Sequence, residues 1–252
     1  MTNAFEGKVA LVTGGSTGIG LEIARAWLAQ GGRRVYITGR SAASLAAAAD
    51  ALGSRAVAVV GDVADLAQLD ALAEQVRQHG DRLDALFANA GIAENNVLGE
   101  TSEAEFDKTF DINVKGLFFT VQACAPLLND GGAIVLTASM CGSLGMENLS
   151  VYSASKAAVR SFARTFAADL KGRRIRVNAL SPGFTRTPIM ENGLKWDEAK
   201  IAALEEFAAG AVPLGYVARP AEIASAALFL ASDAARYTNA AELVVDGGYT
   251  QV

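Results

Sequence analysis

Short runs of β-branched and other apolar residues alternate along the chain with longer helical patterns, and this alternation constrains the fold most. The first run covers residues 9–12 and leads into an amphipathic helical pattern over 19–30. The same rhythm predicts strands at 35–38, 56–60, 83–88, 134–136, 175–180 and 243–245, and helices at 41–52, 66–78, about 103–128, about 152–170 and 220–231. The strands are apolar on both faces, which is typical of parallel strands covered by helices on either side. We therefore expect an α/β fold of three layers, in which a doubly wound sheet of about seven mostly parallel strands lies between two layers of helices.

Residues 185–216 interrupt this rhythm. They contain two prolines and a short helical pattern at about 197–209. In an open parallel sheet, an insertion after the C-terminal end of a strand lies over the ligand crevice. No linker or internal repeat divides the rest of the chain. We therefore predict a single domain spanning residues 1–252, with a substrate lid at about 185–216.

The composition excludes several classes of protein. The 252 residues include 27 acidic and 22 basic side chains, a net charge of −5, which argues against a nucleic-acid-binding protein. The longest uncharged stretch, 131–146, is shorter than a membrane span, and the N-terminus has no basic segment followed by an apolar core. Two cysteines are too few for a disulfide framework. We expect a cytoplasmic protein that binds neither nucleic acid nor membrane.

A glycine-rich loop at residues 13–20, Thr-Gly-Gly-Ser-Thr-Gly-Ile-Gly, joins the first predicted strand to the first helix. Glycines at such a turn let the backbone approach a pyrophosphate, which the free N–H groups of the helix N-terminus bind. The spacing G-x-x-x-G-x-G differs from the usual G-x-G-x-x-G, but its position favours a dinucleotide site in a Rossmann-type sheet. The candidate contacts are Gly14, Ser16, Thr17, Gly18, Ile19 and Gly20.

The same loop also satisfies G-x-S-x-G, the nucleophile motif of α/β-hydrolases. That chemistry needs a general-base histidine late in the chain. The only histidine is His79, which is followed by a glycine that is typical of a helix C-terminus. We therefore expect neither a hydrolase nor, with one histidine and two cysteines, a zinc site.

The end of the second strand bears on the choice of cofactor. NAD-binding sheets usually place an acidic residue here to bind the ribose 2′-hydroxyl. This chain has Arg40 instead, which can bind a 2′-phosphate through charge-assisted hydrogen bonds. Asp62 and Val63 follow the third strand and are candidate contacts of the adenine. We predict NADP (NADPH) as the cofactor, with NAD less favoured.

Tyr152 and Lys156 are four residues apart on a predicted helix, so they share one face. A phenol with a pKa near 10 is a poor acid or base at neutral pH. A neighbouring ammonium group lowers that pKa and suits the phenol to exchange protons with an alcohol or carbonyl oxygen. Ser139 follows the predicted strand 134–136 and should lie at the same edge of the sheet.

With these residues the chain resembles the classical short-chain dehydrogenase/reductase family. Besides the glycine loop, Ser139, Tyr152 and Lys156, the resemblance rests on Asn-Ala-Gly at 89–91, Asn113, and the segments 175–178 and 181–183. These motifs occur in the order and spacing of the family across nearly the whole chain. The resemblance implies hydride transfer between NADP(H) and a secondary alcohol or ketone, as in alcohol dehydrogenases and carbonyl reductases (ketoreductases).

The resemblance also implies the roles of individual residues. Tyr152 is expected to be the general acid/base, Lys156 to lower its pKa and hold the nicotinamide ribose, and Ser139 to orient the carbonyl oxygen. Asn113 is expected to kink its helix and hold a water that links Lys156 to solvent. Further cofactor contacts are implied at Asn89, Gly91, Pro182, Gly183 and Thr187.

The predicted substrate pocket is apolar and has no fixed cation, which favours a hydrophobic or bulky ketone. Its candidate residues follow the sheet edge or lie in the lid, although each could equally be an ordinary core residue: Met140, Cys141, Leu144, Met146, Phe184, Ile189 and Met190.

Two other functions stay open. A 3-oxoacyl-[acyl-carrier-protein] reductase would dock an acidic carrier on basic residues near the site, and basic residues gather at 171–176, whereas 127–130 is neutral to acidic. A non-catalytic NADP-binding sensor would not need Tyr152. Helices around Phe106 and Phe162 are apolar over more than one face. With the family resemblance, this predicts a homotetramer that has the segment 245–249 in its contacts.

Overall fold

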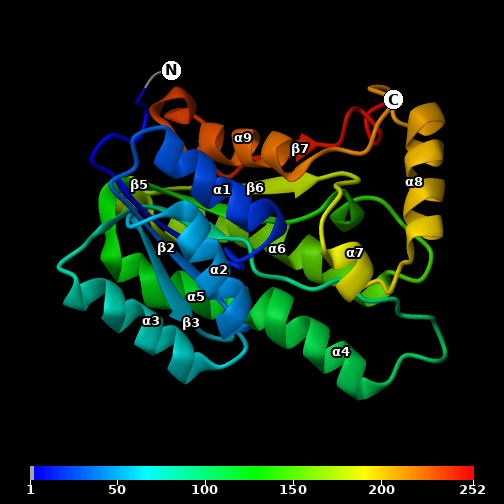
Figure 1. The fold of residues 1–252 in the computed structure, drawn as a ribbon, viewed down its shortest axis with the longest axis horizontal. Helices are drawn as coiled ribbons and strands as arrows, with labels where there is room; N and C mark the ends of the chain where they lie inside the picture. Colours follow the sequence, from blue (N-terminus) through cyan, green and yellow to red (C-terminus); the bar gives the residue numbers. More distant parts are fainter. Residues whose placement is uncertain (1–2) are drawn as a thin grey trace.

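In the computed structural model, which describes residues 3–252, seven parallel strands form one sheet (Figure 1). They are β1 (Val9–Thr13), β2 (Arg34–Gly39), β3 (Ala56–Val60), β4 (Leu83–Ala88), β5 (Leu128–Thr137), β6 (Arg176–Pro182) and β7 (Glu242–Val245). Their order is β3-β2-β1-β4-β5-β6-β7. The order reverses between β1 and β4, and such a switch point is where open α/β sheets bind ligands. The predicted fold class is confirmed, and every strand pair is parallel.

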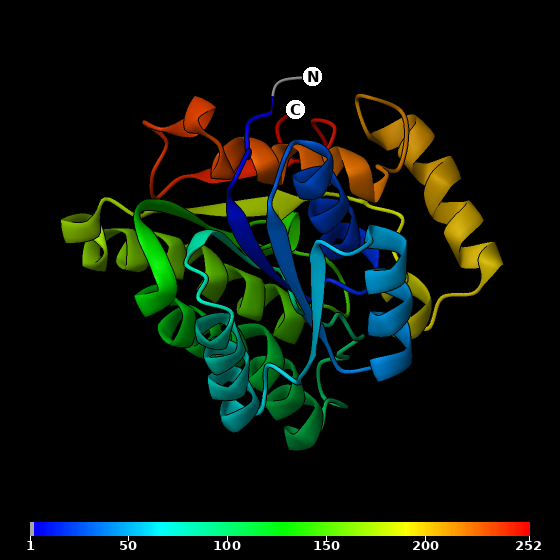
Figure 2. The same cartoon turned by 60° about the vertical axis from the view of Figure 1, so that its left-hand side comes forward.

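Helices cover both faces of the sheet (Figure 2). One layer contains α1 (Gly18–Ala29), α2 (Ala42–Leu52) and α9 (Pro220–Ala231), and the other contains α3 (Leu66–Gln78), α4 (Glu103–Phe110), α5 (Leu117–Cys124) and α6 (Ser150–Asp169). The remaining helices are α7 (Ile189–Asn192) and α8 (Glu198–Ala211). Strand β1 shows why both layers form. Its Val9 and Leu11 join one buried cluster and Ala10 and Val12 the other, because side chains alternate along a strand.

The prediction of one long helix at about 103–128 is wrong, because this range contains several separate helical elements. Helix α4 is followed by a π-helical segment, Asp111–Gly116, and then by α5. A 3₁₀ turn containing Pro126 ends the helical path, because proline has no N–H group to continue it. Strand β5 therefore begins at Leu128, six residues before the predicted start. The other predicted boundaries lie within two residues of those observed.

The parallel arrangement brings the loops after β1, β4, β5 and β6 to one edge of the sheet. The basic residues at 171–174 precede β6, and Arg176 begins this strand, so they lie at the opposite edge. None of the helices within residues 3–252 is long and apolar enough to cross a membrane.

Candidate functional site

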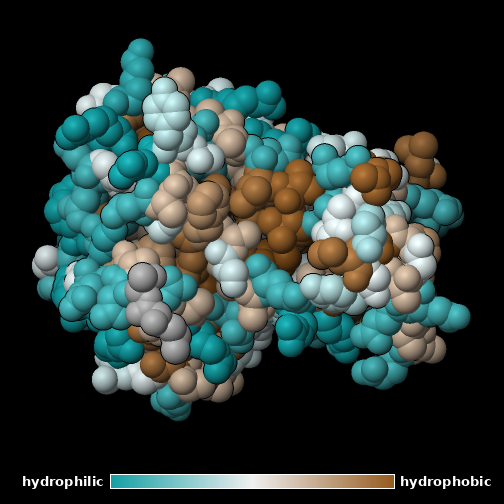
Figure 3. Space-filling model, turned by 90° about the horizontal axis from the view of Figure 1, so that it is seen from above, coloured by the Kyte–Doolittle hydropathy of each residue, from teal (hydrophilic) through white to brown (hydrophobic). Residues whose placement is uncertain are grey.

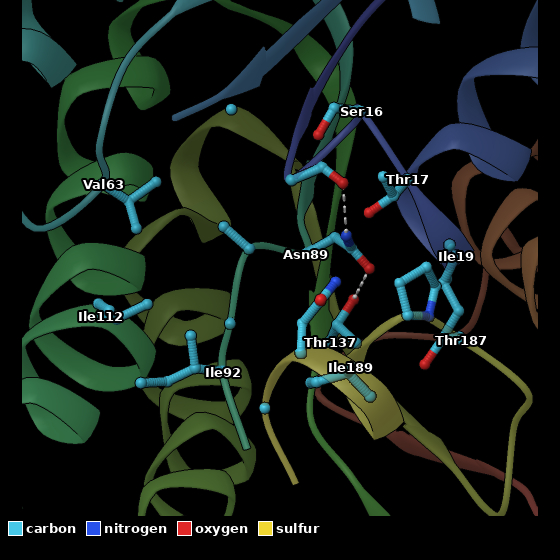
Figure 4. A pocket seen from close by; sticks show the side chains of 18 of the residues that line it. Ser16, Thr17, Ile19, Val63, Asn89, Ile92, Ile112, Thr137, Thr187 and Ile189 are labelled. Atoms are coloured by element: carbon cyan, nitrogen blue, oxygen red, sulfur yellow. Dashed lines mark hydrogen bonds between the residues drawn. The ribbon is translucent and has the colours of Figure 1, made fainter. Parts of the chain in front are cut away.

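A cleft of about 520 Å³ opens at the carboxyl ends of the strands (Figure 4). Val63, Ile92 and Ile112 lie on the left of the view and Ile19 and Thr187 on the right, with Asn89 and Ile189 near its centre. Most of the predicted cofactor contacts line this cleft: Gly14, Ser16, Thr17, Gly18, Ile19, Arg40, Asp62, Val63, Asn89, Gly91, Tyr152, Lys156, Pro182, Gly183 and Thr187. The predicted contact Gly20 is not among the lining residues.

Gly20 acts instead through the shape of the loop. A Cβ atom at Gly20 would lie 2.2 Å from the Gly14 carbonyl oxygen, so only glycine lets helix α1 start this close to the strand end. Gly14 itself has a φ of +64°, a conformation that favours glycine. The side chain of the N-cap residue Thr17 makes no capping hydrogen bond, which leaves the first N–H groups of α1 to a ligand. The loop therefore fits a phosphate group.

Asn89 ties the glycine loop to the ends of β1 and β5 (Figure 4). Its backbone N–H donates to Thr13 Oγ1 (3.0 Å), and its side-chain Nδ2 donates to the Thr13 carbonyl oxygen (3.1 Å). The Thr137 hydroxyl donates to Asn89 Oδ1 (3.3 Å). Asn89 thus fixes the floor of the cleft between the phosphate loop and the strand that leads to Ser139.

Three of the predicted catalytic side chains line the same cleft: Ser139, Tyr152 and Lys156. Lys156 is only 4% exposed, and its ammonium group donates to the Thr137 carbonyl oxygen (2.9 Å). The Lys156 Nζ atom lies 5.7 Å from the centre of the Tyr152 ring. Ser139 Oγ accepts a hydrogen bond from the Cys141 N–H (3.2 Å), so its hydroxyl hydrogen points to other acceptors, such as Tyr152 or a substrate oxygen.

Asn113 does not line the cleft but supports it from behind. It lies in the π-helical segment, where Oδ1 accepts from the Ile92 N–H (2.8 Å) and Nδ2 donates to the Ile92 carbonyl (2.9 Å) and Ser155 Oγ (3.0 Å). A Cβ atom at Gly91 would lie 3.1 Å from Asn113 Oδ1 and 3.2 Å from Lys156 Nζ. Asn113 and Lys156 therefore approach each other across Gly91, where glycine leaves the space between them open.

The pKa values differ from the expectation that Lys156 lowers the pKa of Tyr152. Burial raises the pKa of Tyr152 to about 12, although the Ser139 hydroxyl opposes the shift. Burial also lowers the pKa of Lys156 to about 8. The physical reason is that a poorly hydrated site disfavours both charged forms. Without ligand, the phenol is therefore strongly held in its protonated form.

The pKa of Lys156 predicts how stability depends on pH. Between about pH 8 and its ordinary value of 10.5, the folded protein has released a proton that the unfolded chain still binds, so raising the pH favours folding. From pH 7.5 to pH 9.5, the wild type should gain about 2 kcal/mol of unfolding free energy relative to Lys156→Met. Urea denaturation of both proteins at the two pH values measures this gain. A constant difference between them would contradict the burial of a titrating amine.

The predicted substrate residues divide between two apolar clusters. Met140 and Cys141 form a buried cluster with Leu149, and packed against it are Met146, Tyr152, Phe184, Leu194 and Tyr249. Met190 lies in a second cluster with Ile201 and Leu204, against which Ile189 and Phe184 pack. Of the seven predicted residues, only Ile189 lines the cleft. Leu144 is half-buried and belongs to neither cluster. The structure thus places four of them beside Tyr152 and assigns Met190 to the core of the 185–216 segment.

Sequence reasoning missed several residues of this region. The rim of the cleft includes Glu94, Lys108, Asn192 and Lys195, and Lys108 Nζ pairs with Glu94 Oε1 at 2.6 Å. Asn95 Nδ2 donates to the Leu194 carbonyl (3.3 Å), so the 185–216 segment bonds to the loop after β4. The sequence around Lys108 did not indicate this ion pair, because its partner Glu94 lies 14 residues earlier in a loop.

Comparisons with known proteins agree with this geometry. Residues 14–250 match the family model described as "Enoyl-(Acyl carrier protein) reductase". The chain is 39% identical to D-threitol dehydrogenase of Mycolicibacterium smegmatis, covering 98% of this chain and 94% of that protein. It is 37% identical to cyclopentanol dehydrogenase of Comamonas sp., covering 96% and 97%. The crystal structure of levodione reductase superposes with a TM-score of 0.91 at 33% identity, covering 98% of this chain and all of that one.

Proposed function

The chain belongs to the short-chain dehydrogenase/reductase family of oxidoreductases, whose members bind a nicotinamide cofactor, and we propose that it interconverts a ketone and a secondary alcohol with NADP(H). One observation carries the proposal: Ser139, Tyr152 and Lys156 line the same cleft as the glycine loop. The phosphate site would bind the cofactor while the proton donor lies close to the carbonyl group of the substrate, so the two reactants are held together in one cleft.

In the proposed reaction, Ser139 donates a hydrogen bond to the carbonyl oxygen and Tyr152 gives that oxygen its phenolic proton. A nicotinamide cofactor held by the glycine loop and Lys156 would supply the hydride for the carbonyl carbon, or accept it in the reverse direction. Lys156 stabilises the phenolate that Tyr152 becomes when it loses its proton. Asn113 binds the backbone of Ile92 and so holds the loop at Gly91, beside Lys156, in place. Because the pKa of Tyr152 is raised to about 12, the phenol keeps its proton at neutral pH, and alcohol oxidation, which needs the phenolate as a base, should speed up as the pH rises.

Support for NADP over NAD comes from the adenosine end of the cleft. Arg40 lines it with an exposed side chain directly after β2. Asp62 lines the same end, but its Oδ1 atom accepts from the Ala64 N–H (3.0 Å) in the loop before α3. The guanidinium group suits a 2′-phosphate, and the position after β2 that would hold an acidic residue in NAD-binding sheets lacks one.

We propose a hydrophobic substrate, because the side chains packed around Tyr152 are apolar or sulfur-bearing. A panel of ketones and secondary alcohols, run with NADPH and NADH side by side, tests the function. We expect NADPH-dependent reduction of hydrophobic ketones with the 185–216 segment acting as a lid. Absence of turnover with every member would contradict the enzyme proposal.

The matching family model makes an acyl-carrier-protein substrate the second candidate. The basic residues at 171–176, which would have to dock the acidic carrier, lie before and at the start of β6, whereas Pro182 and Gly183 in the cleft lie at its other end. The Arg173 side chain is moreover engaged, since it pairs with Asp130 at 2.8 Å and donates to the Ala125 carbonyl. The basic residues thus lie at the wrong edge of the sheet, which disfavours this candidate. Turnover of a 3-oxoacyl carrier in the same panel would favour it.

We also propose a homotetramer. The face of the molecule seen in Figure 3 carries a contiguous hydrophobic area, and α9 and the edge strand β7 lie on this side (Figure 1). Phe229 on α9 and Phe106 on α4 are exposed, which is costly unless a partner covers them. Gel filtration should give the mass of four chains of 26.1 kDa, and elution as a monomer would contradict the proposal.

We further propose a cytoplasmic location. Both cysteines are unpaired, in keeping with a reducing compartment.

A further inference from the structure

One side chain joins the turn after β5 to the helix that carries Tyr152 and to the edge strand β7. Arg160 lies on α6, one helical turn after Lys156. Its Nη1 atom donates to the Gly142 carbonyl oxygen (3.1 Å), and its Nε atom pairs with Glu242 Oε2 on β7 (2.5 Å). Arg160 does not line the cleft, so an effect on the reaction has to act through these contacts.

Both oxygens of the Glu242 carboxylate have a partner. Ser181 is fully buried in β6, and its hydroxyl donates to Glu242 Oε1 (2.6 Å). The next residue, Pro182, lines the cleft. The side chains of Arg160 and Glu242 are 27% and 20% exposed, so water and salt screen their attraction less than that of a surface pair. The carboxylate thus ties Arg160 to the end of β6 at the cleft.

The turn that Arg160 contacts is the one that carries Ser139. The Ser139 Oγ atom accepts from the Cys141 N–H (3.2 Å), and the Ser139 carbonyl oxygen accepts from the Gly142 N–H (2.9 Å). A Cβ atom at Gly142 would lie 3.1 Å from Arg160 Cδ and 3.1 Å from the Lys156 carbonyl carbon. Glycine therefore lets the turn pack directly on α6 beside Lys156, where the guanidinium group of Arg160 binds its carbonyl oxygen.

We propose that Arg160 and Glu242 are positioning residues, which hold the Ser139 hydroxyl where it binds the carbonyl oxygen of the substrate. This inference rests on the proposed ketone reductase function. Without the guanidinium group, the Gly142 carbonyl is no longer bonded to a side chain of α6, and the Ser139 turn can shift relative to Tyr152. A shift of about 1 Å is enough to weaken a catalytic hydrogen bond strongly.

The test removes the guanidinium group in the presence and in the absence of the Ser139 hydroxyl. We expect Arg160→Met, which keeps an unbranched stem, to lower kcat for acetophenone reduction about tenfold and to leave the KM for NADPH within about twofold of the wild type. In a Ser139→Ala background, the same change should lower kcat by less than about twofold, because no hydroxyl remains to be positioned. Equal losses in the two backgrounds would show a merely structural role and would overturn the inference.

Two further variants complete the test. Glu242→Gln keeps the size of the side chain and one acceptor oxygen, and it should lower kcat about threefold with the same dependence on Ser139. Arg25→Met is the matched control, because Arg25 forms an exposed pair with Glu22 (3.3 Å) on α1 and does not line the cleft. We expect the control to keep the wild-type kcat. Wild-type kcat in Glu242→Gln and in Arg160→Met would overturn the inference.

A second measurement is independent of turnover. Hydrogen–deuterium exchange of the segment 138–144, followed by mass spectrometry, should be at least about fivefold faster in Arg160→Met than in the wild type, with exchange in α1 unchanged. Equal exchange of this segment in the two proteins would overturn the inference. If the wild type reduces no ketone but Arg160→Met exchanges faster at 138–144, the proposed function fails while the role of Arg160 in holding the Ser139 turn stands.

Discussion

Replacing Tyr152 by phenylalanine should lower kcat for ketone reduction about a thousandfold or more while leaving NADPH binding within about twofold of the wild type. The change removes one oxygen atom and keeps the ring that packs against Met140, Cys141 and Leu149. The substrate oxygen then loses the proton donor, and the solvent cannot replace it efficiently in a site where burial already raises the pKa of Tyr152 to about 12. Steady-state kinetics and fluorescence titration of NADPH measure the two effects.

The control for this change is Tyr237→Phe, because Tyr237 is fully exposed and lies outside both the cleft and the segment 185–216. We expect the control to keep wild-type turnover. A non-catalytic sensor would show the opposite pattern, since its output would survive Tyr152→Phe. Unchanged turnover in Tyr152→Phe would remove Tyr152 from the proposed mechanism.

Replacing Arg40 by alanine should raise the KM for NADPH by about 10- to 100-fold and leave the KM for NADH nearly unchanged. The guanidinium group lines the adenosine end of the cleft, and a 2′-phosphate there forms charge-assisted hydrogen bonds. NADH has no 2′-phosphate and so loses no such bond.

Arg236→Ala is the matched control, because Arg236 is an exposed arginine outside the cleft residues. Its KM values for both cofactors should stay at the wild-type level. An equal increase for NADPH and NADH in Arg40→Ala would mean that Arg40 supports the loop rather than binds the 2′-phosphate, and a wild-type preference for NADH would contradict the NADP proposal.

Local sequence patterns were sufficient for the sheet and for many of the residues that line the cleft. The glycine loop and Arg40 directly follow strands, so their position in a parallel sheet is set by the chain order of the strands. Tyr152 and Lys156 share a helix face because of the helical repeat. These features depend on neighbours along the chain, and for this reason they could be predicted.

Features that depend on distant residues could not be predicted. Asn113 is held by Ile92 and Ser155, 21 and 42 residues away, and Tyr249 joins the cluster of Tyr152 only in the folded chain. The raised pKa of Tyr152 was missed for the same reason, because desolvation follows from packing that no spacing of Tyr and Lys reveals. Met140, Cys141 and Met190 are buried and do not line the cleft, so an apolar residue after a strand does not by its position reveal whether it faces a substrate.

A crystal structure of the complex with NADP⁺ tests the central claim most directly, namely that cofactor and proton donor meet in this cleft. We predict that the pyrophosphate lies on the loop from Gly14 to Gly20, the 2′-phosphate at Arg40, and the nicotinamide beside the Tyr152 hydroxyl, with Lys156 bonded to the adjoining ribose. A nicotinamide ring bound away from Tyr152, with the phenol turned out of the cleft, would contradict the account.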